Sequence, residues 1–190
     1  PSFKKENIID EEQFLAYFGD FFQNISTKKI GVSLPDASIK VLIRKFNEVP
    51  KNLNEIHEMI LWNLSSFLDV PVDELRVSWE NKGKTHNGSH TFLIALGMEK
   101  IISQYEKILK KIDVSPLLYS PSGLNQFNFY SKILPEKGNV AYLGLFDDFL
   151  NIFVFSDGLP VFYKIIKKGM LDAHAGSAIN DVDLLIQYYN

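Results

Sequence analysis

The sequence predicts a mixed α/β fold in which sheets are flanked by helices. Segments with helical periodicity and short strand-like runs alternate along its 190 residues. The composition is 46% hydrophobic and 23% charged, which is typical of a globular chain long enough to bury a core. We find no internal repeat and no low-complexity linker. The chain is therefore expected to form one domain or two small lobes.

The expected elements follow one another along the whole chain. Asp10 and Gln13 have the spacing of a helix N-cap, and Asn54 is the expected cap of the second long helix. Residues 81–88 contain Gly and Asn and predict a hairpin with a long tip. In order, we expect a helix at 10–25, strands at 28–35 and 38–46, a helix at 54–68, strands at 74–80 and 89–97, a helix at 98–112, a strand at 114–120, a short helix at 123–132, three strands within 139–169 and a last helix at 177–190.

Charge and composition exclude several classes of protein. The net charge is −3 and no basic patch is evident, so we expect no nucleic-acid partner. The chain has no cysteine, which excludes disulfides and thiolate chemistry. No apolar run approaches the roughly 20 residues of a membrane-spanning helix, so we expect no direct membrane insertion. Because it begins with Pro1 and ends inside an expected helix, the sequence is consistent with a fragment of a longer protein.

The usual sequence signatures of catalysis and metal binding are weak. His86 and His90 are four residues apart but lie in an expected loop without a third ligand, and neither His57 nor His174 has a visible partner. Ser33 lacks the glycine that follows a hydrolase nucleophile. Neither of the two common glycine-rich phosphate-binding motifs is present. We therefore expect no catalytic residue and no metal site.

Four segments together resemble a known family. They are "KKIGVSLPDASIKVLIRKFNEVP", "LNEIHEMILWNLSSFLDVPVDELRVSWE", "HTFLIALGMEKIISQYEKILKKIDVSPLLYSPSGLNQF" and "NVAYLGLFDDFLNIFVFSDGLPVFYKIIKKG". In order and rough spacing they resemble the actin-like PilM-type proteins of type IV pilus assembly. These proteins are related to the cell-division protein FtsA and to the cytoplasmic domain of GspL-type proteins of type II secretion. The resemblance covers most of the chain from Lys28 onward.

This resemblance implies an actin-like (ribonuclease H-like) α/β fold that is incomplete or degenerate in this chain. A first lobe is expected at 1–136, with an inserted α/β subdomain at about 31–96. Residues 137–190 are expected to begin a second lobe with three strands and a helix, truncated relative to the family. The N-terminal Asp-x-Gly hairpin of the family is missing from these residues.

In nucleotide-binding relatives, the first strand of the second lobe carries an Asp-x-Gly turn that approaches phosphate closely. Here Gly144 stands at the position of the acid and Phe146 at that of the glycine, and Asp147 and Asp148 follow. A bulky ring would obstruct the phosphate, and the two carboxylates would repel it. We therefore expect no bound cofactor; ATP with Mg²⁺ remains the alternative, with Asp147 or Asp148 holding the cation.

The leading interpretation is a non-catalytic scaffold or recruitment protein of a pilus or type II secretion-like assembly. It implies inner-membrane protein partners and a cytoplasmic location peripheral to the membrane. It leaves open whether the protein forms a homo-oligomer. The alternatives are a nucleotide-binding actin-like protein and an unrelated α/β binding module. Phe3, Phe127, Phe129 and Tyr130 are candidate exposed aromatic residues, but the sequence does not select the partner-binding surface.

Overall fold

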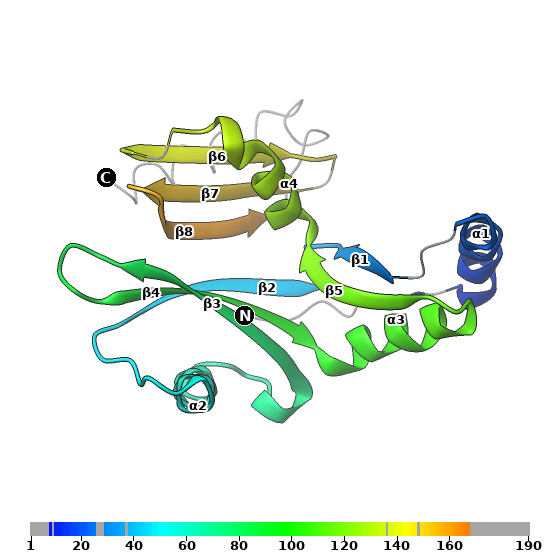
Figure 1. Cartoon of the computed structure of the whole chain (residues 1–190), viewed down its shortest axis with the longest axis horizontal. Coiled ribbons are helices and arrows are strands. Elements are labelled where there is room, and N and C mark those ends of the chain that lie inside the picture. The colour runs from blue at the N-terminus through cyan, green and yellow to red at the C-terminus, as the bar shows by residue number, and fades with distance from the viewer. Residues whose placement is uncertain are drawn as a thin grey trace. The chain divides into compact units, whose positions relative to one another are not determined.

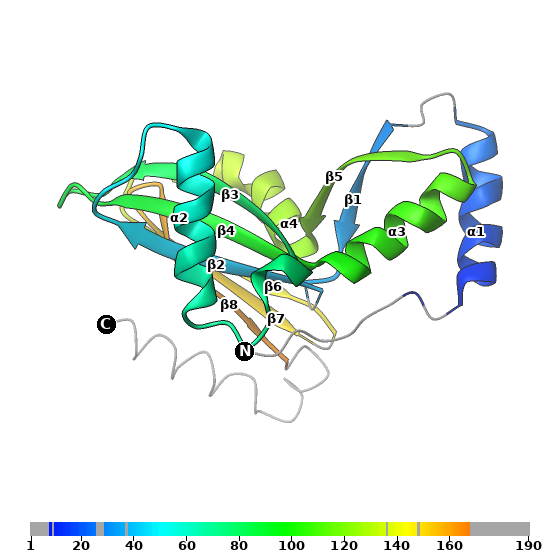
Figure 2. The ribbon, with the colours of Figure 1, turned by 90° about the horizontal axis from the view of Figure 1, so that it is seen from below.

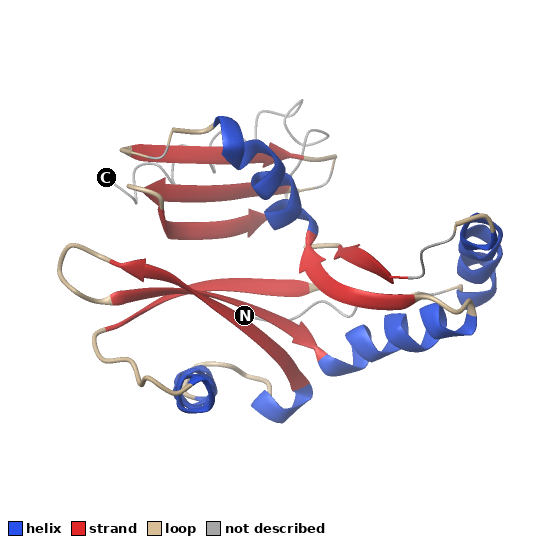
Figure 3. Ribbon diagram, viewed as in Figure 1, coloured by secondary structure: helices blue, strands red, loops and turns tan. Residues whose placement is uncertain are grey.

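The computed structural model describes residue 8 and residues 10–25, 29–36, 38–135, 137–147 and 149–167. It divides the chain into two compact units, Pro1–Asn125 and Gln126–Asn190. The predicted lobe bounds at 136 and 137 stay a prediction. The elements, drawn in Figures 1 and 3, are α1 (Glu11–Gln23), β1 (Lys29–Leu34), β2 (Ile39–Phe46), α2 (Leu53–Ser65), η1 (Val72–Glu74), β3 (Leu75–Lys84), β4 (His90–Met98), α3 (Glu99–Lys111), β5 (Ser115–Pro121), α4 (Ser122–Tyr130), η2 (Ser131–Ile133), β6 (Asn139–Leu145), β7 (Leu150–Ser156) and β8 (Leu159–Ile166).

An antiparallel sheet of order β2-β4-β3 forms one part of the first unit, and α2 lies across one of its faces (Figure 2). The contact surface follows directly from periodicity. Phe92, Ile94 and Leu96 alternate along β4 and are fully buried. They pack against the buried residues of α2, which recur every four positions: Ile56, Ile60 and Leu64. Full burial of each such side chain contributes about 1.5–3 kcal/mol. These six residues therefore form a substantial hydrophobic core between α2 and its sheet.

The other part of the first unit is built on two parallel strands, β1 and β5. Parallel strands require a long crossover connection, and the segment from β2 through α3 supplies it. Helices α1 and α3 meet over these strands in a cluster that contains Phe22, Leu109 and Val114. Asp10 caps α1 as predicted, because its Oδ1 accepts a hydrogen bond from the Gln13 N–H at 2.8 Å.

The second unit contains an antiparallel meander of order β6-β7-β8. Asp157 and Gly158 join β7 to β8 with positive φ angles of 49° and 78°, as a two-residue hairpin turn requires. The Phe127 ring of α4 stacks on Phe155 at 4.4 Å and contacts Phe153 at 4.8 Å. The prediction of an exposed Phe127 is therefore wrong, because its ring completes this aromatic core.

The structure decides several other sequence expectations. Phe129 and Tyr130 are exposed as predicted, at 75% and 45%, while Phe3 and the helix expected at 177–190 lie outside the described residues. The cap of α2 is Asn52 and not Asn54: the Asn52 Oδ1 accepts a hydrogen bond from the Asn54 N–H at 2.8 Å. The expected long hairpin tip is short, since β3 continues to Lys84 and only 85–89 join it to β4. Within the described ranges, no helix combines the length and apolar character needed to cross a membrane.

Candidate functional site at the β6–β7 turn

The turn that the sequence aligns with the phosphate-binding turn of the resembled family joins β6 to β7. Leu145 and Leu150 are the last paired residues of the two strands, and Gly144 lies opposite Asn151. The Phe146 N–H donates a hydrogen bond to the Phe149 carbonyl oxygen at 3.0 Å. This bond closes the turn and engages the amide of Phe146 inside it.

Aromatic packing fixes the side chains of this turn. The rings of Phe146 and Phe149 stack with centroids 4.2 Å apart and planes 13° apart. Such stacking contributes about 0.5–1.5 kcal/mol beyond the burial of area. Phe146 is half-buried, so its ring is held against the protein and does not project freely into solvent.

Gly144 is buried beneath this ring. A Cβ atom at position 144 would lie 3.3 Å from Cε2 of Phe146, and 3.5 Å from atoms of both Tyr142 and Asn151. The side of the backbone that glycine leaves open, which would allow phosphate to approach, therefore contains aromatic and amide side chains. A larger residue at position 144 would require the Phe146 ring to shift by a few tenths of an ångström.

Only one of the two acidic residues of the turn is among the described residues. Asp147 is exposed, whereas Asp148 lies outside the described residues. In the described part of the chain, no group of three or more His, Cys, Asp or Glu residues could hold a metal ion. The described turn thus offers one carboxylate to a ligand, and its aromatic rings cover the neighbouring backbone.

Three other residues singled out in the sequence have side-chain hydrogen-bond partners. The Trp79 Nε1–H donates to His57 Nδ1 at 3.3 Å, and His90 Nδ1 lies 3.0 Å from Asn81 Nδ2. The Asn125 Nδ2 donates to the Ser33 hydroxyl oxygen at 2.9 Å. His86 lies in the hairpin tip, and His174 lies outside the described residues. The hydrogen bonds of His57, His90 and Ser33 to other side chains give these three residues a structural role.

Asp36 is a buried acid that sequence reasoning missed. Its carboxylate accepts a hydrogen bond from the Ser122 hydroxyl at 2.8 Å, and its two oxygens lie 2.9 Å and 3.1 Å from the Gly123 N. A carboxylate is well placed at a helix N-terminus, where backbone N–H groups lack partners. Asp36 therefore anchors the start of α4. The sequence gives no local signal, since the two partners are 87 residues apart.

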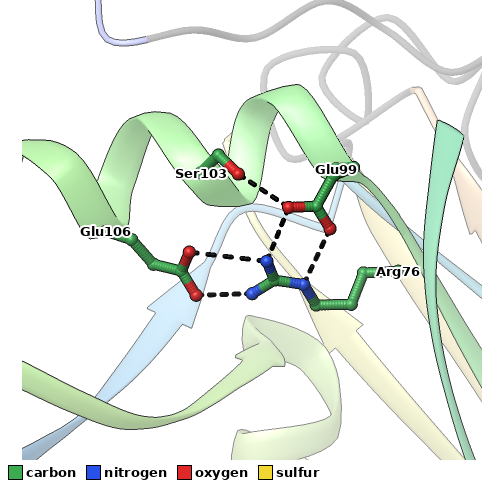
Figure 4. Close-up of polar contacts among 4 residues, drawn as sticks. All are labelled: Arg76, Glu99, Ser103 and Glu106. Atoms are coloured by element: carbon green, nitrogen blue, oxygen red, sulfur yellow. Dashed lines mark hydrogen bonds and ion pairs between the residues drawn. The ribbon is translucent and has the colours of Figure 1, made fainter.

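A second group missed in the sequence surrounds Arg76 of β3 (Figure 4). Its guanidinium donates to both oxygens of Glu99 at 2.6 Å and 2.9 Å, and also to Glu106. The Ser103 hydroxyl donates to Glu99 at 2.6 Å. The hydrogen bonds to Glu106 and Glu99 raise the pKa of Arg76 further above its ordinary value. These contacts tie the β2-β4-β3 sheet to α3, which gives the network a structural role.

Comparison with known proteins finds solved structures with a similar fold. No family model and no curated protein matches the sequence. The structure of the "PilM-PilN type IV pilus biogenesis complex" matches with a TM-score of 0.74 and 10% identity, over 90% of this chain and 53% of that chain. The cytoplasmic domain of EpsL, an inner membrane component of the type II secretion system of Vibrio cholerae, matches with a TM-score of 0.53 and 12% identity, over 80% of this chain and 56% of that one.

A third matching structure is named for its actin-like ATPase fold. It is a Bacteroides thetaiotaomicron protein with an actin-like ATPase fold, and it matches with a TM-score of 0.50 and 15% identity, over 97% of this chain and 67% of that chain. The chain spans about half of the length of the PilM–PilN and EpsL structures that it matches. At these identities the similarity concerns the fold. The predicted actin-like α/β fold is thus confirmed: this chain has the fold shared by these pilus, secretion and actin-like ATPase-fold proteins.

Proposed function

We propose that this protein is a non-catalytic, actin-like adaptor in a machine of the type IV pilus or type II secretion kind. In this role it recruits inner-membrane partner proteins from the cytoplasmic side and uses no nucleotide of its own. The fold supports the general role, because the matching structures include a pilus biogenesis complex and a cytoplasmic domain of a secretion system.

The observation that carries the proposal is the position of Phe146 over Gly144. A phosphate could approach this backbone only after the ring had moved away, which breaks its stack with Phe149 and opens the hydrogen bond that closes the turn. The stack contributes about 0.5–1.5 kcal/mol and the hydrogen bond about as much. Together, at about 1–3 kcal/mol, they would weaken nucleotide binding roughly 5- to 150-fold.

The exposed carboxylate of Asp147 adds a smaller effect. Two unit charges 4 Å apart in water repel each other by about 1 kcal/mol, and salt screens this repulsion at an exposed position. Displacement of the ring is therefore the larger obstacle. The alternative function, nucleotide binding through a bridging cation, would depend on Asp147 or Asp148.

Calorimetry with ATP and Mg²⁺ tests the absence of a nucleotide site. We expect the wild-type chain to give no binding heat. Micromolar binding that Asp147→Ala abolishes, and that the control Asp20→Ala on the exposed surface of α1 leaves intact, would establish the nucleotide-binding function instead.

Co-purification tests the adaptor role. The tagged chain would be expressed together with membrane-anchored proteins encoded beside it, and detergent extracts would be analysed with and without added ATP. We expect an inner-membrane protein to be retained in defined stoichiometry under both conditions. Retention only in the presence of ATP, or no retained partner, contradicts the proposal.

A further inference from the structure

The outward face of α2 carries a large aromatic side chain that the fold does not use. The helix buries Ile56, Ile60 and Leu64 against its sheet, and the helical period places Trp62 on the opposite side. Trp62 is 77% exposed. Tryptophan is enriched among the residues that contribute most of the binding energy at the centres of protein interfaces.

Two acidic residues share this face with Trp62. Glu58 lies four residues and Glu55 seven residues before it, so all three occupy one stripe of α2. Both carboxylates belong to exposed residues, and in the part of the chain that the structure describes no ion pair engages either of them. We call Glu55, Glu58 and Trp62 the acidic face. Its chemistry suits a partner that presents ammonium groups along a helix.

Such a partner surface is present on the same chain. Helix α3 buries Ile101, Ile108 and Leu109, and its opposite side carries exposed Lys100 and Lys107, with Lys110 one turn further. We call these three lysines the basic face. Lys111 is not part of it, because its ammonium group pairs with Glu11.

The two faces match in charge and in spacing. Helices α2 and α3 both have 13 residues. Glu55 and Trp62 are seven positions apart, as are Lys100 and Lys107, which corresponds to about 10.5 Å along each helix axis. A lysine ammonium can lie over the face of the indole ring while its neighbours pair with the glutamates.

We propose that the acidic face of α2 docks on the basic face of α3 in a second copy of this chain. The two helices lie apart within the first unit (Figure 2), so one molecule cannot join its own faces. Since the two surfaces are different, a pair joined by one such contact retains one free acidic face and one free basic face. The contact can therefore extend head-to-tail into open chains or rings. One helix face on each side makes a small interface, so the association is weak and depends on salt.

Sedimentation velocity of the 190-residue chain over a range of concentrations tests the contact. We expect the sedimentation coefficient to rise with concentration in about 0.1 M salt and to be constant in about 1 M salt, where the Debye length falls from about 10 Å to about 3 Å. Trp62→Ala should weaken association at least about 10-fold. The matched control is Tyr17→Ala on α1, which removes a similarly exposed aromatic ring (75%) and should have no effect.

A charge exchange identifies the occupant. The variant E55K/E58K and the variant K100E/K107E should each remain monomeric, and a mixture of the two should associate because every contact is then between opposite charges. A monomeric wild-type chain in low salt, equal effects of Trp62→Ala and Tyr17→Ala, or a mixture that stays monomeric overturns the proposal. Binding of oligolysine to Trp62 without self-association also overturns it, since the occupant would then be another protein.

Discussion

Individual residues in this protein have roles that depend on what they touch. Gly144 and Phe146 lie in a turn whose sequence departs from that of a phosphate site, and the sequence predicts a ring where such a site needs a bare backbone. The sequence does not predict that the ring folds back over Gly144 and stacks on Phe149. Contacts between side chains, and not residue types alone, decide whether the backbone is accessible.

The Arg76 network allows a prediction about pH at this scale. The hydrogen bond from Arg76 and a second from Ser103 lower the pKa of Glu99 below its ordinary value of 4.5. Because the folded-state pKa is lowered, the network stabilises the fold fully above about pH 4.5 and loses this effect as the pH falls through the lowered pKa. Arg76→Met should thus destabilise the chain at neutral pH, and the difference from wild type should shrink in acid.

Denaturant unfolding between neutral pH and acid pH measures this difference. The side chains of Arg76 and Glu99 are 40% and 43% exposed, so solvent screening limits the loss to at most about 1 kcal/mol. Lys82→Met, which removes the exposed pair of Lys82 with Glu80, is the control and should show almost no loss. A loss for Arg76→Met that does not change with pH would mean that Arg76 contributes only packing.

At the scale of single elements, the start of α2 shows which of two candidate asparagines caps a helix. Asn52 and Asn54 are both good capping residues, two positions apart. Asn52 has the extended backbone of a cap, with φ −86° and ψ 132°, and its side chain reaches the Asn54 N–H. The structure therefore begins α2 at Leu53.

This assignment predicts a difference between two similar substitutions. Asn52→Ala should reduce the free energy of unfolding by about 1 kcal/mol, because the N–H groups at the helix start lose a side-chain acceptor. Asn54→Ala should change it by less than about 0.5 kcal/mol, since residue 54 contributes only its backbone N–H to the cap. Thermal or denaturant unfolding of the two variants compares them directly; a larger loss for Asn54→Ala would contradict the assignment of the cap.

Strand β3 shows a second effect at this scale. The sequence suggested that the glycine at 83 belongs to a loop, yet the strand continues through it. Gly83 has a φ of 118°, and the register with β4 shifts between Asn81 and Gly83. A glycine with positive φ at a bulge allows a strand to continue with a local bend. Residue propensities alone cannot distinguish a bulge from a turn, because glycine is favoured in both.

At the scale of the whole molecule, the two units have separate cores. Ile94 is buried in the cluster between α2 and its sheet, and Phe153 is buried in the meander, at 0% and 2% exposure. Ile94 packs in the cluster with residues of α2, and the Phe153 ring contacts the rings of Phe127 and Phe155, which belong to its own unit. We therefore expect a core substitution to loosen its own unit first.

Hydrogen exchange tests this independence. Phe153→Ala should cost about 3–5 kcal/mol and Ile94→Ala about 2–5 kcal/mol. The first should speed amide exchange in β6–β8 while β2–β4 stay protected, and the second should do the reverse. Equal acceleration in both units, for either variant, would show that they unfold as one cooperative body.

The sequence by itself determined the order and type of most elements and the faces that they bury. Period-two and period-3.6 patterns record local burial, so β4 and α2 could be recognised without a structure. The resemblance that implied the actin-like fold, and the altered turn at 144–147, also rested on runs of neighbouring residues.

Only the tertiary structure decided which distant residues meet. Asp36 reaches the start of α4 across 87 positions, Arg76 reaches α3 across 23 and 30 positions, and Phe127 enters the aromatic core of the meander. The exposure of Trp62 likewise became evident only when its helix was seen on its sheet. These facts depend on how the packed elements bring separated segments together, and a one-dimensional pattern does not record that packing.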